Sequence, residues 1–120
     1  MRAMVRDPCT MGEDEDLDVF GCDARHPERL AGACEGAPLV VSALGGSLAL
    51  RYTPPDAGYR DVDLRANLNL LAEARRAGVR RFVYVSLYGA EALRGLGYVD
   101  AHEEFVAALK GSGLEYAVVR

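Results

Sequence analysis

The sequence lacks the features that mark membrane, nucleic-acid-binding and repeat proteins. No apolar run approaches the ~20 residues of a membrane-spanning helix, and a formal net charge of −4 argues against a general nucleic-acid binder. No sustained apolar segment follows Arg2, so we expect no signal peptide. Internal repeats and low-complexity tracts are also missing. We therefore expect a globular protein with no nucleic-acid or membrane partner.

Cysteine is scarce, and its pattern favours neither a set of disulfide bonds nor a structural metal site. Cys9, Cys22 and Cys34 are an odd number with no metal-like spacing. We interpret them as reduced, partly buried thiols of a cytoplasmic protein, and predict no metal site. With 120 residues, of which 50% are hydrophobic and 27% charged, the chain suits one domain with a modest core. Its oligomeric state is not predicted by the sequence.

Short apolar runs that alternate with amphipathic segments predict an α/β fold. The expected strands cover residues 2–6, 17–20, 39–43, 82–85 and 116–119. The expected helices cover residues 27–34, the segment between Asp61 and Gly78, and residues 98–110. Proline and glycine mark residues 47–60 and 87–96 as loops.

Helical spacing of apolar residues predicts which sides of the later helices are buried. The stripe of the helix before Gly78 comprises Leu64, Leu68, Leu70, Leu71 and Ala74. The inner side of the last helix comprises Val99, Phe105, Val106 and Leu109. We expect Gly78 at positive φ, where it ends its helix. We also expect Asn69 to satisfy backbone or loop groups beneath the sheet.

Residues 61–86 read DVDLRANLNLLAEARRAGVRRFVYVS, a helix, a glycine and a buried strand in succession. This segment resembles the atypical short-chain dehydrogenases/reductases of the NmrA-like, NAD(P)H-binding kind. Their members typically read VD-x-x-x-N-x-N-L-x-x-A-x-x-A-G-V-x-R-F-V-Y-V-S here. The resemblance extends over nearly all of the chain. It implies a Rossmann-type parallel sheet with flanking helices, and residues 1–120 as a partial NAD(P)-binding domain.

One element of such a domain is missing. A dinucleotide-binding fold opens with a strand, a glycine-rich turn and a helix that holds the pyrophosphate, yet G-x-x-G-x-x-G does not occur. The first strand is central in the usual strand order, so its absence opens the sheet down the middle and leaves residues 2–6 without one neighbour. We expect an internal piece of a family member, without the first strand, the first helix and the substrate region; a minimal domain is the alternative.

Three groups of residues are candidates for cofactor binding. Arg6 follows the first strand and suits the 2′-phosphate of NADP, although Asp7 would suit NAD and a solvated arginine is the alternative. The resemblance implies that Asp23 lies beside the adenine; otherwise its carboxylate serves the N-terminus of the next helix. The small residues that close the strand 39–43 let a ribose approach the backbone, which selects Ala43, Leu44 and Gly45.

The resemblance also implies catalytic positions. The family's reductases use a serine after the strand 82–85 and a Tyr-x-x-x-Lys pair on the next helix, which selects Ser86, Tyr98 and His102. Tyrosine is the acid/base, and lysine lowers its pKa. Histidine replaces lysine here and is largely neutral at pH 7, so it would do this less well. Tyr98 as an amphipathic anchor of the helix is the alternative.

Three functions follow from these residues. The first is NADP(H)-dependent reduction of a small carbonyl or unsaturated substrate, with NAD as a possible second cofactor. The second is a non-catalytic NAD(P) sensor that regulates a partner, which the histidine at position 102 favours. The third is an inactive fragment, because no other loop replaces the pyrophosphate-binding helix N-terminus.

Overall fold

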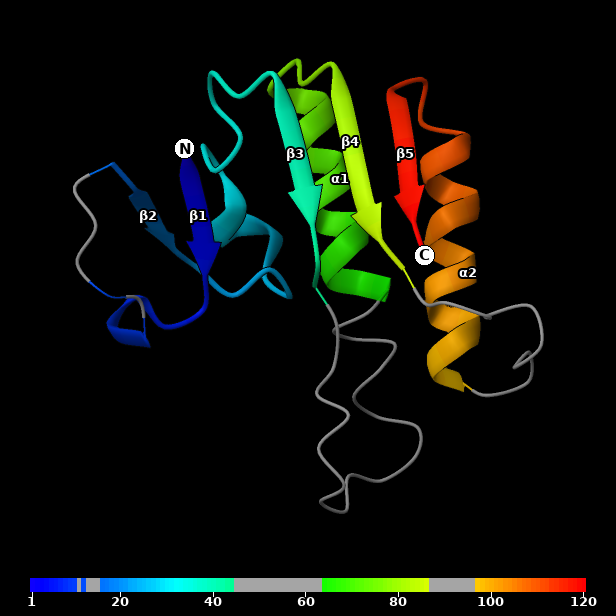
Figure 1. Ribbon diagram of the computed structural model, residues 1–120, viewed down its shortest axis with the longest axis horizontal. Coiled ribbons are helices and arrows are strands. Elements are labelled where there is room, and N and C mark those ends of the chain that lie inside the picture. The colour runs from blue at the N-terminus through cyan, green and yellow to red at the C-terminus, as the bar shows by residue number, and fades with distance from the viewer. Residues whose placement is uncertain (11, 13–15, 45–63, 87–96) are drawn as a thin grey trace.

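The computed structural model describes residues 1–10, 12, 16–44, 64–86 and 97–120, without the side chains of Thr10 and Tyr98 (Figure 1). Gly45 and the two predicted loops at 47–60 and 87–96 lie outside the described residues.

Two strands near the N-terminus form a small parallel sheet. β1 (Arg2–Val5) pairs with β2 (Asp18–Gly21), with Met4 opposite Phe20 in the register. Asp18 donates its backbone N–H to the carbonyl of Met1, and Cys22 donates to Val5, so the pairing continues just past both strand ends. A short 3₁₀ turn, η1 (Pro8–Thr10), follows β1.

The other three strands form a second parallel sheet in the order β3-β4-β5. β3 (Leu39–Ser42), β4 (Arg81–Val85) and β5 (Glu115–Val119) are joined by the two long helices α1 (Asn67–Arg76) and α2 (Gly97–Lys110). A parallel pair needs such a crossover, because its strands start at the same end of the sheet. The fold is thus Rossmann-like α/β, as predicted. No helix in the described ranges is long and apolar enough to cross a membrane.

Much of the hydrophobic core lies between the β3–β5 sheet and its two helices, and the same cluster extends to Cys22, Leu30 and Cys34 after β2. Phe82 and Tyr84 of β4 are fully buried against Phe105 of α2, with ring centroids 5.9 and 4.6 Å away. The predicted inner side of α2 is confirmed: Val99, Phe105, Val106 and Leu109 are all buried. Figure 1 shows both helices behind the sheet, and on the opposite face Leu39, Val41 and Val85 are exposed.

Two details of the predicted helices are wrong. The segment expected to be helical over 27–34 is only a 3₁₀ helix, η2 (Pro27–Leu30), followed by turns. Ala31 has an extended backbone and Gly32 a φ of 85°, so α-helical hydrogen bonding cannot continue. Leu68 is 37% exposed instead of belonging to the buried stripe of α1. The helix does end at Gly78 with positive φ (76°), as predicted.

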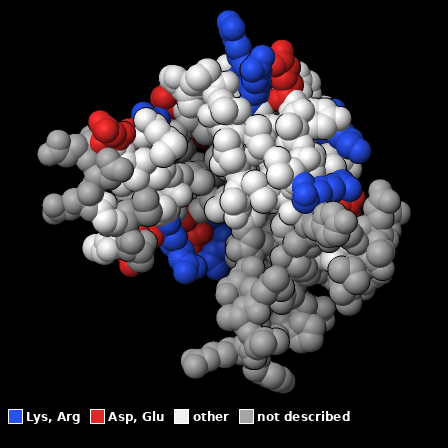
Figure 2. All heavy atoms as spheres, in the orientation of Figure 1, with Lys and Arg blue, Asp and Glu red and all other residues white. Residues whose placement is uncertain are grey.

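The sheet is open in the middle. Within the described residues, β1 pairs only with β2 and β3 only with β4. A cavity of about 790 Å³ lies between their facing edges, lined by Ala3 and Met4 of β1, by all of β3 and by Leu70 of α1. We call this cavity the central slot. Figure 2 shows a hollow between the two halves of the molecule, of which one contains β1 and β2 and the other contains β3, β4 and β5. Within the described residues, the prediction that residues 2–6 lack a neighbour on one side is therefore confirmed.

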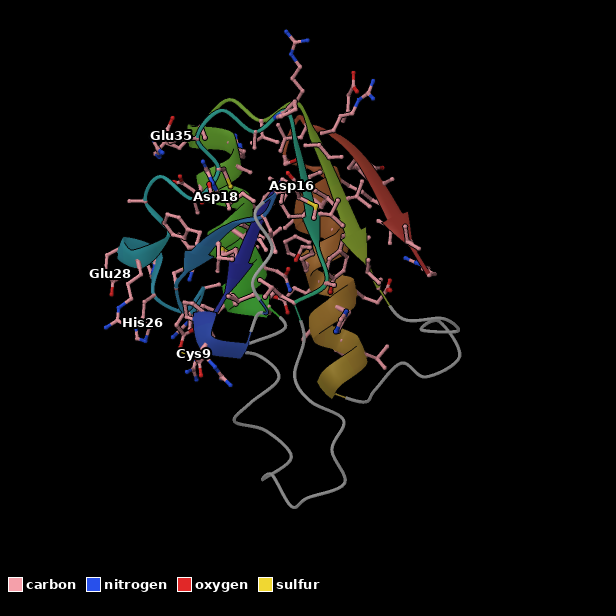
Figure 3. The ribbon with its side chains drawn as sticks, turned by 60° about the vertical axis from the view of Figure 1, so that its left-hand side comes forward. Cys9, Asp16, Asp18, His26, Glu28 and Glu35 are labelled. Atoms are coloured by element: carbon pink, nitrogen blue, oxygen red, sulfur yellow. The ribbon has the colours of Figure 1, made fainter. Side chains whose placement is uncertain are left out.

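Polar contacts tie the two halves together around the slot. The Arg2 guanidinium donates to the carbonyls of Ala33 (3.0 Å) and Glu35 (3.1 Å), and to the Asp18 carboxylate (2.9 Å). In Figure 3, Asp18 and Glu35 lie toward one end of the half that contains β1 and β2, while Cys9 and His26 lie at the other end. Arg2 therefore closes the amino end of the slot.

Helix α1 makes the remaining ties. Glu73 accepts a hydrogen bond from the backbone N–H of Gly32 (3.0 Å), and Arg76 pairs with both Glu73 and Glu35 (2.8 Å each). Asn69 donates to the carbonyl of Ala24 (2.9 Å), which confirms its predicted structural role. The helix thus holds the segment that connects β2 to β3, and its Leu70 lines the slot.

Candidate functional site

The carboxyl ends of the five parallel strands lie toward the same edge of the molecule (Figure 1). Arg6 follows β1, Asp23 follows β2, Ala43 follows β3 and Ser86 follows β4. Ligands of open α/β sheets bind at this edge, because the loops that leave the strands diverge there. The structure thus brings one predicted site residue from each of four strands to the same edge, in the lateral order Asp23, Arg6, Ala43, Ser86.

The two candidates next to β1 and β2 differ in how their charges are engaged. Arg6 is exposed at a bend directly after β1. Asp23 is partly buried and accepts hydrogen bonds from the Arg25 guanidinium (2.7 Å) and the Arg25 backbone N–H (3.0 Å). The Arg25 guanidinium holds the pKa of the Asp23 carboxyl well below its usual range. Asp23 is therefore a carboxylate whose position is fixed by its neighbour.

The Asp23 carboxylate does not cap η2, and its alternative role as an acidic group near the N-terminus of that helix stays a prediction. The residue at the N-cap of η2 is His26, and no side chain caps that turn. The Asp23 carboxylate bonds Arg25 instead, two residues before the turn begins. Only the backbone carbonyl of Asp23 takes part, by accepting from the N–H of His26 (3.0 Å).

The end of β3 is held by a buried amide that the sequence interpretation did not select. The Asn67 side chain is fully buried at the start of α1. Its oxygen accepts from the Ser42 hydroxyl (2.5 Å), and its nitrogen donates to the carbonyl of Leu44 (3.1 Å). This bracket fixes the backbone of Ala43, which is exposed, and of Leu44, which is half-buried. The only indication in the sequence was that Asn67 lies in the helix that follows β3. Asn69, two residues later, lies in the same helix, so the sequence did not distinguish the two.

The candidates for catalysis lie around β4 and α2. Ser86 donates its backbone N–H to Val119 (2.7 Å), which fixes it beside the end of β5. Its hydroxyl oxygen is buried and has no hydrogen-bond partner in the described part of the chain. A buried hydroxyl without a partner is costly, so it is a group that can accept or donate to a ligand. Tyr98 lies in the first turn of α2, and its side chain is outside the described residues.

His102 lies one turn after Tyr98 and is buried between α2 and β4. Its Nδ1 is hydrogen-bonded to the hydroxyl of Tyr84, and the two rings are 5.6 Å apart. The Tyr84 ring in turn packs edge-on against Phe105. His102 is therefore built into the interface between the sheet and the helix.

Sequence comparison decides the family. A family model described as NAD(P)H-binding matches residues 1–120. The chain belongs to this NAD(P)H-binding family. The membership confirms the expectation drawn from residues 61–86, and a nicotinamide dinucleotide is the ligand class of that family. A comparison with curated protein sequences gives no match.

Solved structures resemble the fold of this NAD(P)H-binding protein at low identity. The NADPH-dependent quinone oxidoreductase of Escherichia coli, in complex with NADPH, is 24% identical with a TM-score of 0.67, over 98% of this chain and 38% of that one. The triphenylmethane reductase of Citrobacter sp., in complex with NADP(H), is 22% identical with a TM-score of 0.70, over 98% and 38%. The Bordetella bronchiseptica enzyme WbmG, in complex with NAD, is 15% identical with a TM-score of 0.80, over 99% and 44%. The chain therefore spans less than half the length of these three proteins.

Proposed function

We propose that the edge formed by the strand ends binds NADP(H), and that it supports reduction of a small carbonyl or unsaturated substrate. The observation that carries the proposal is the alignment of Asp23, Arg6, Ala43 and Ser86 along one edge of a parallel sheet in an NAD(P)H-binding family member. Those groups match the parts of a dinucleotide from its adenine to its nicotinamide.

The residues present fit the adenosine half of the cofactor. Arg6 is exposed, so its guanidinium is available to a 2′-phosphate, for which it offers a bidentate and charge-assisted contact. The fixed carboxylate of Asp23 suits the amino group of the adenine. Ala43 presents no bulk that would keep a ribose from the backbone held by Asn67. The preference for NADP over NAD rests on Arg6 alone.

The residues near β4 fit the reacting end. NADP(H), when bound, supplies the hydride. The buried Ser86 hydroxyl would donate to the substrate oxygen, and the Tyr98 hydroxyl would supply its proton as general acid. His102 holds the Tyr84 hydroxyl, so within this proposal it positions α2 and sets the turn that carries Tyr98.

One observation favours a second function, a sensor that binds NAD(P)H without turnover. A lysine one turn after the tyrosine would supply a permanent positive charge, whereas His102 is buried and hydrogen-bonded to Tyr84. A tyrosine without that charge has an ordinary pKa and is a weaker acid. Turnover on a panel of small carbonyls, lost in Tyr98→Phe, would support the reductase; binding with no turnover would support the sensor.

The binding proposal is tested by titrating the chain with NADPH and NADH while following the fluorescence of the cofactor. We expect NADPH to bind more tightly, and Arg6→Ala to remove about tenfold of affinity for NADPH with no change for NADH, as expected for one charge-assisted contact. Arg80→Ala is the matched control, since Arg80 is also exposed but precedes β4 at the opposite edge. An Arg6→Ala variant that keeps the NADPH preference would contradict the proposal.

A further inference from the structure

We propose that Arg25 is a positioning residue for cofactor recognition, which holds the Asp23 carboxylate in one orientation toward the purine base. In that orientation the carboxylate favours adenine, which carries an amino group at position 6, over hypoxanthine, which carries a carbonyl there. The inference rests on the proposed binding of NADP(H) at the strand ends, and it names the residue that sets the specificity of that site for the base. Arg25 acts through Asp23 and needs no contact of its own with the cofactor.

The Arg25 side chain holds both oxygens of the Asp23 carboxylate. Its Nη2 donates to Oδ2 at 2.7 Å, and its Nε lies 3.0 Å from Oδ1 and 3.1 Å from Oδ2. The backbone N–H of Arg25 also donates to Oδ1, at 3.0 Å. A planar guanidinium that meets a carboxylate through two nitrogens fixes the plane of the carboxylate as well as its place. Rotation of the Asp23 carboxylate would break these bonds, so its orientation is set.

The turn that carries the pair is anchored to the rest of the protein. Ala24, between the two residues, is buried, and its carbonyl accepts a hydrogen bond from Asn69 of α1 at 2.9 Å. The carbonyl of Asp23 accepts from the N–H of His26 at 3.0 Å. In Figure 3, His26 lies at the same end of the molecule as Cys9, which belongs to the turn after β1. The pair is therefore held at the edge where the strands end.

The chemistry of the pair suits an amino group and rejects a carbonyl. Hydrogen bonds from the Arg25 guanidinium lower the pKa of the Asp23 carboxyl, so the carboxylate is ionised and only accepts hydrogen bonds. A carboxylate has about four acceptor positions, and three N–H groups of Arg25 use them here, which leaves room for one donor from a ligand. The amino group of adenine supplies that donor, whereas the carbonyl of hypoxanthine brings a second acceptor against the carboxylate. Such a repelled alternative is a common source of specificity.

Burial and charge show why the carboxylate depends on Arg25. The Asp23 side chain is 16% exposed, whereas that of Arg25 is 43% exposed. A mostly covered carboxylate loses much of its hydration, and the guanidinium replaces it. The pairing also offsets a negative charge that would otherwise repel the phosphates of a dinucleotide. Without Arg25, water would compete for the carboxylate, and its lone pairs would lose their fixed direction.

The test is a fluorescence titration of the chain with NADPH and with its hypoxanthine counterpart, in which a carbonyl replaces the 6-amino group. Both carry the same nicotinamide and the same 2′-phosphate, so a contact with Arg6 cancels in the ratio of the two dissociation constants. We expect the unaltered chain to bind NADPH about tenfold more tightly, as one hydrogen bond to a charged group provides. In Arg25→Ala the carboxylate stays but loses its fixed orientation, and the preference should fall below about threefold.

Three further variants separate orientation from charge and from direct contact. Arg29→Ala removes an exposed arginine of η2 and changes the net charge equally, and it should keep the preference of the unaltered chain. Arg25→Lys keeps the charge but not the two-nitrogen contact, so its preference should fall as well, and it decides the matter if Arg25→Ala does not fold. Asp23→Asn supplies an amide N–H to the 6-carbonyl, so the preference should vanish or reverse. Circular dichroism checks the fold, and a merely structural loss would weaken both dinucleotides equally and leave the ratio unchanged.

The possible failures are distinguishable. Arg25 variants that keep the tenfold preference, or an Arg29→Ala variant that loses it, would overturn the inference. An unaltered chain that binds the two dinucleotides equally would also overturn it, while the binding of NADPH would still support the proposed function. A chain that binds neither dinucleotide would overturn the proposed function, and this inference with it.

Discussion

The two halves of this molecule use different means to hold their strands. The β3–β5 sheet packs on α1 and α2 through a buried aromatic cluster of Phe82, Tyr84 and Phe105. The β1–β2 pair has half-buried strands: Met4 and Phe20 pack against the edge of the same core, and Arg2 donates to the carbonyl of Ala33 in the turn before β3. The candidate cofactor edge therefore crosses the boundary between a fully packed half and a half-buried one.

The consequence is a difference in local stability. Regions with few buried apolar contacts open at lower free energy than the core. We therefore expect the amides of β1 and β2 to exchange faster than those of β4. Arg6 and Asp23 belong to the half whose amides are expected to exchange faster. A cofactor that contacts them would therefore bind to the half with the lower local stability.

The largest expected effect comes from the packed half. Phe105→Ala should cost about 3–5 kcal/mol of the free energy of unfolding, because it removes a fully buried ring and leaves a cavity. Phe20→Ala in β2 should cost only about 1–2 kcal/mol, because Phe20 is half-buried. Urea unfolding followed by circular dichroism measures both. Equal losses would contradict the distinction between the halves.

The second largest loss of stability is expected from removing the Asn67 hydrogen bonds at the end of β3. Asn67→Ala leaves the Ser42 hydroxyl and the Leu44 carbonyl without their partner, at a cost of about 2–3 kcal/mol. Asn69→Ala is the matched variant on the same helix, and it should cost about 1 kcal/mol because its bond to Ala24 is only partly buried. The free energy of unfolding decides the order, and a reversed order would show that the tie to the other half carries more of the stability.

These contacts also show what the sequence could predict. The strands were predictable to within one residue at most ends, because short β-rich runs between glycine and proline have few other solutions. The helix expected over 27–34 was wrong, because the extended backbone at Ala31 and the positive φ of Gly32 break the helical hydrogen bonds. The gap between β1 and β3 was predicted because G-x-x-G-x-x-G does not occur in the given sequence and the strand that precedes this motif is central in the usual strand order.

Side-chain engagement at the site was harder to predict. Asn67 and Asn69 are the same residue type on the same helix, so the sequence does not distinguish them. The way α1 packs against β3 decides that Asn67 bonds to Ser42. The hydrogen bond between His102 and Tyr84 joins residues of α2 and β4, and no spacing of residues within either element predicts it. Spacing alone could place these residues on a helix or strand but could not select their partners.

The smallest expected effect is a pH dependence of the tie at Glu73. The Arg76 guanidinium lowers the pKa of the Glu73 carboxyl in the folded chain. The carboxylate therefore contributes stability that is fully present above its unfolded pKa and is lost as the pH falls through the lower, folded pKa. Glu73→Gln should flatten this part of the acid-side stability profile, measured by urea unfolding at a series of pH values below 5. Glu104→Gln, an exposed carboxyl on α2, is the control.

The most direct test of the account is hydrogen exchange of the chain as NADPH is added. If the strand ends form one cofactor edge, protection should appear at residues 5–8, 22–25 and 42–44 with a single common midpoint, so that both halves respond together. Protection confined to one half, or separate midpoints for the two halves, would contradict the claim that NADPH binds across the boundary between them.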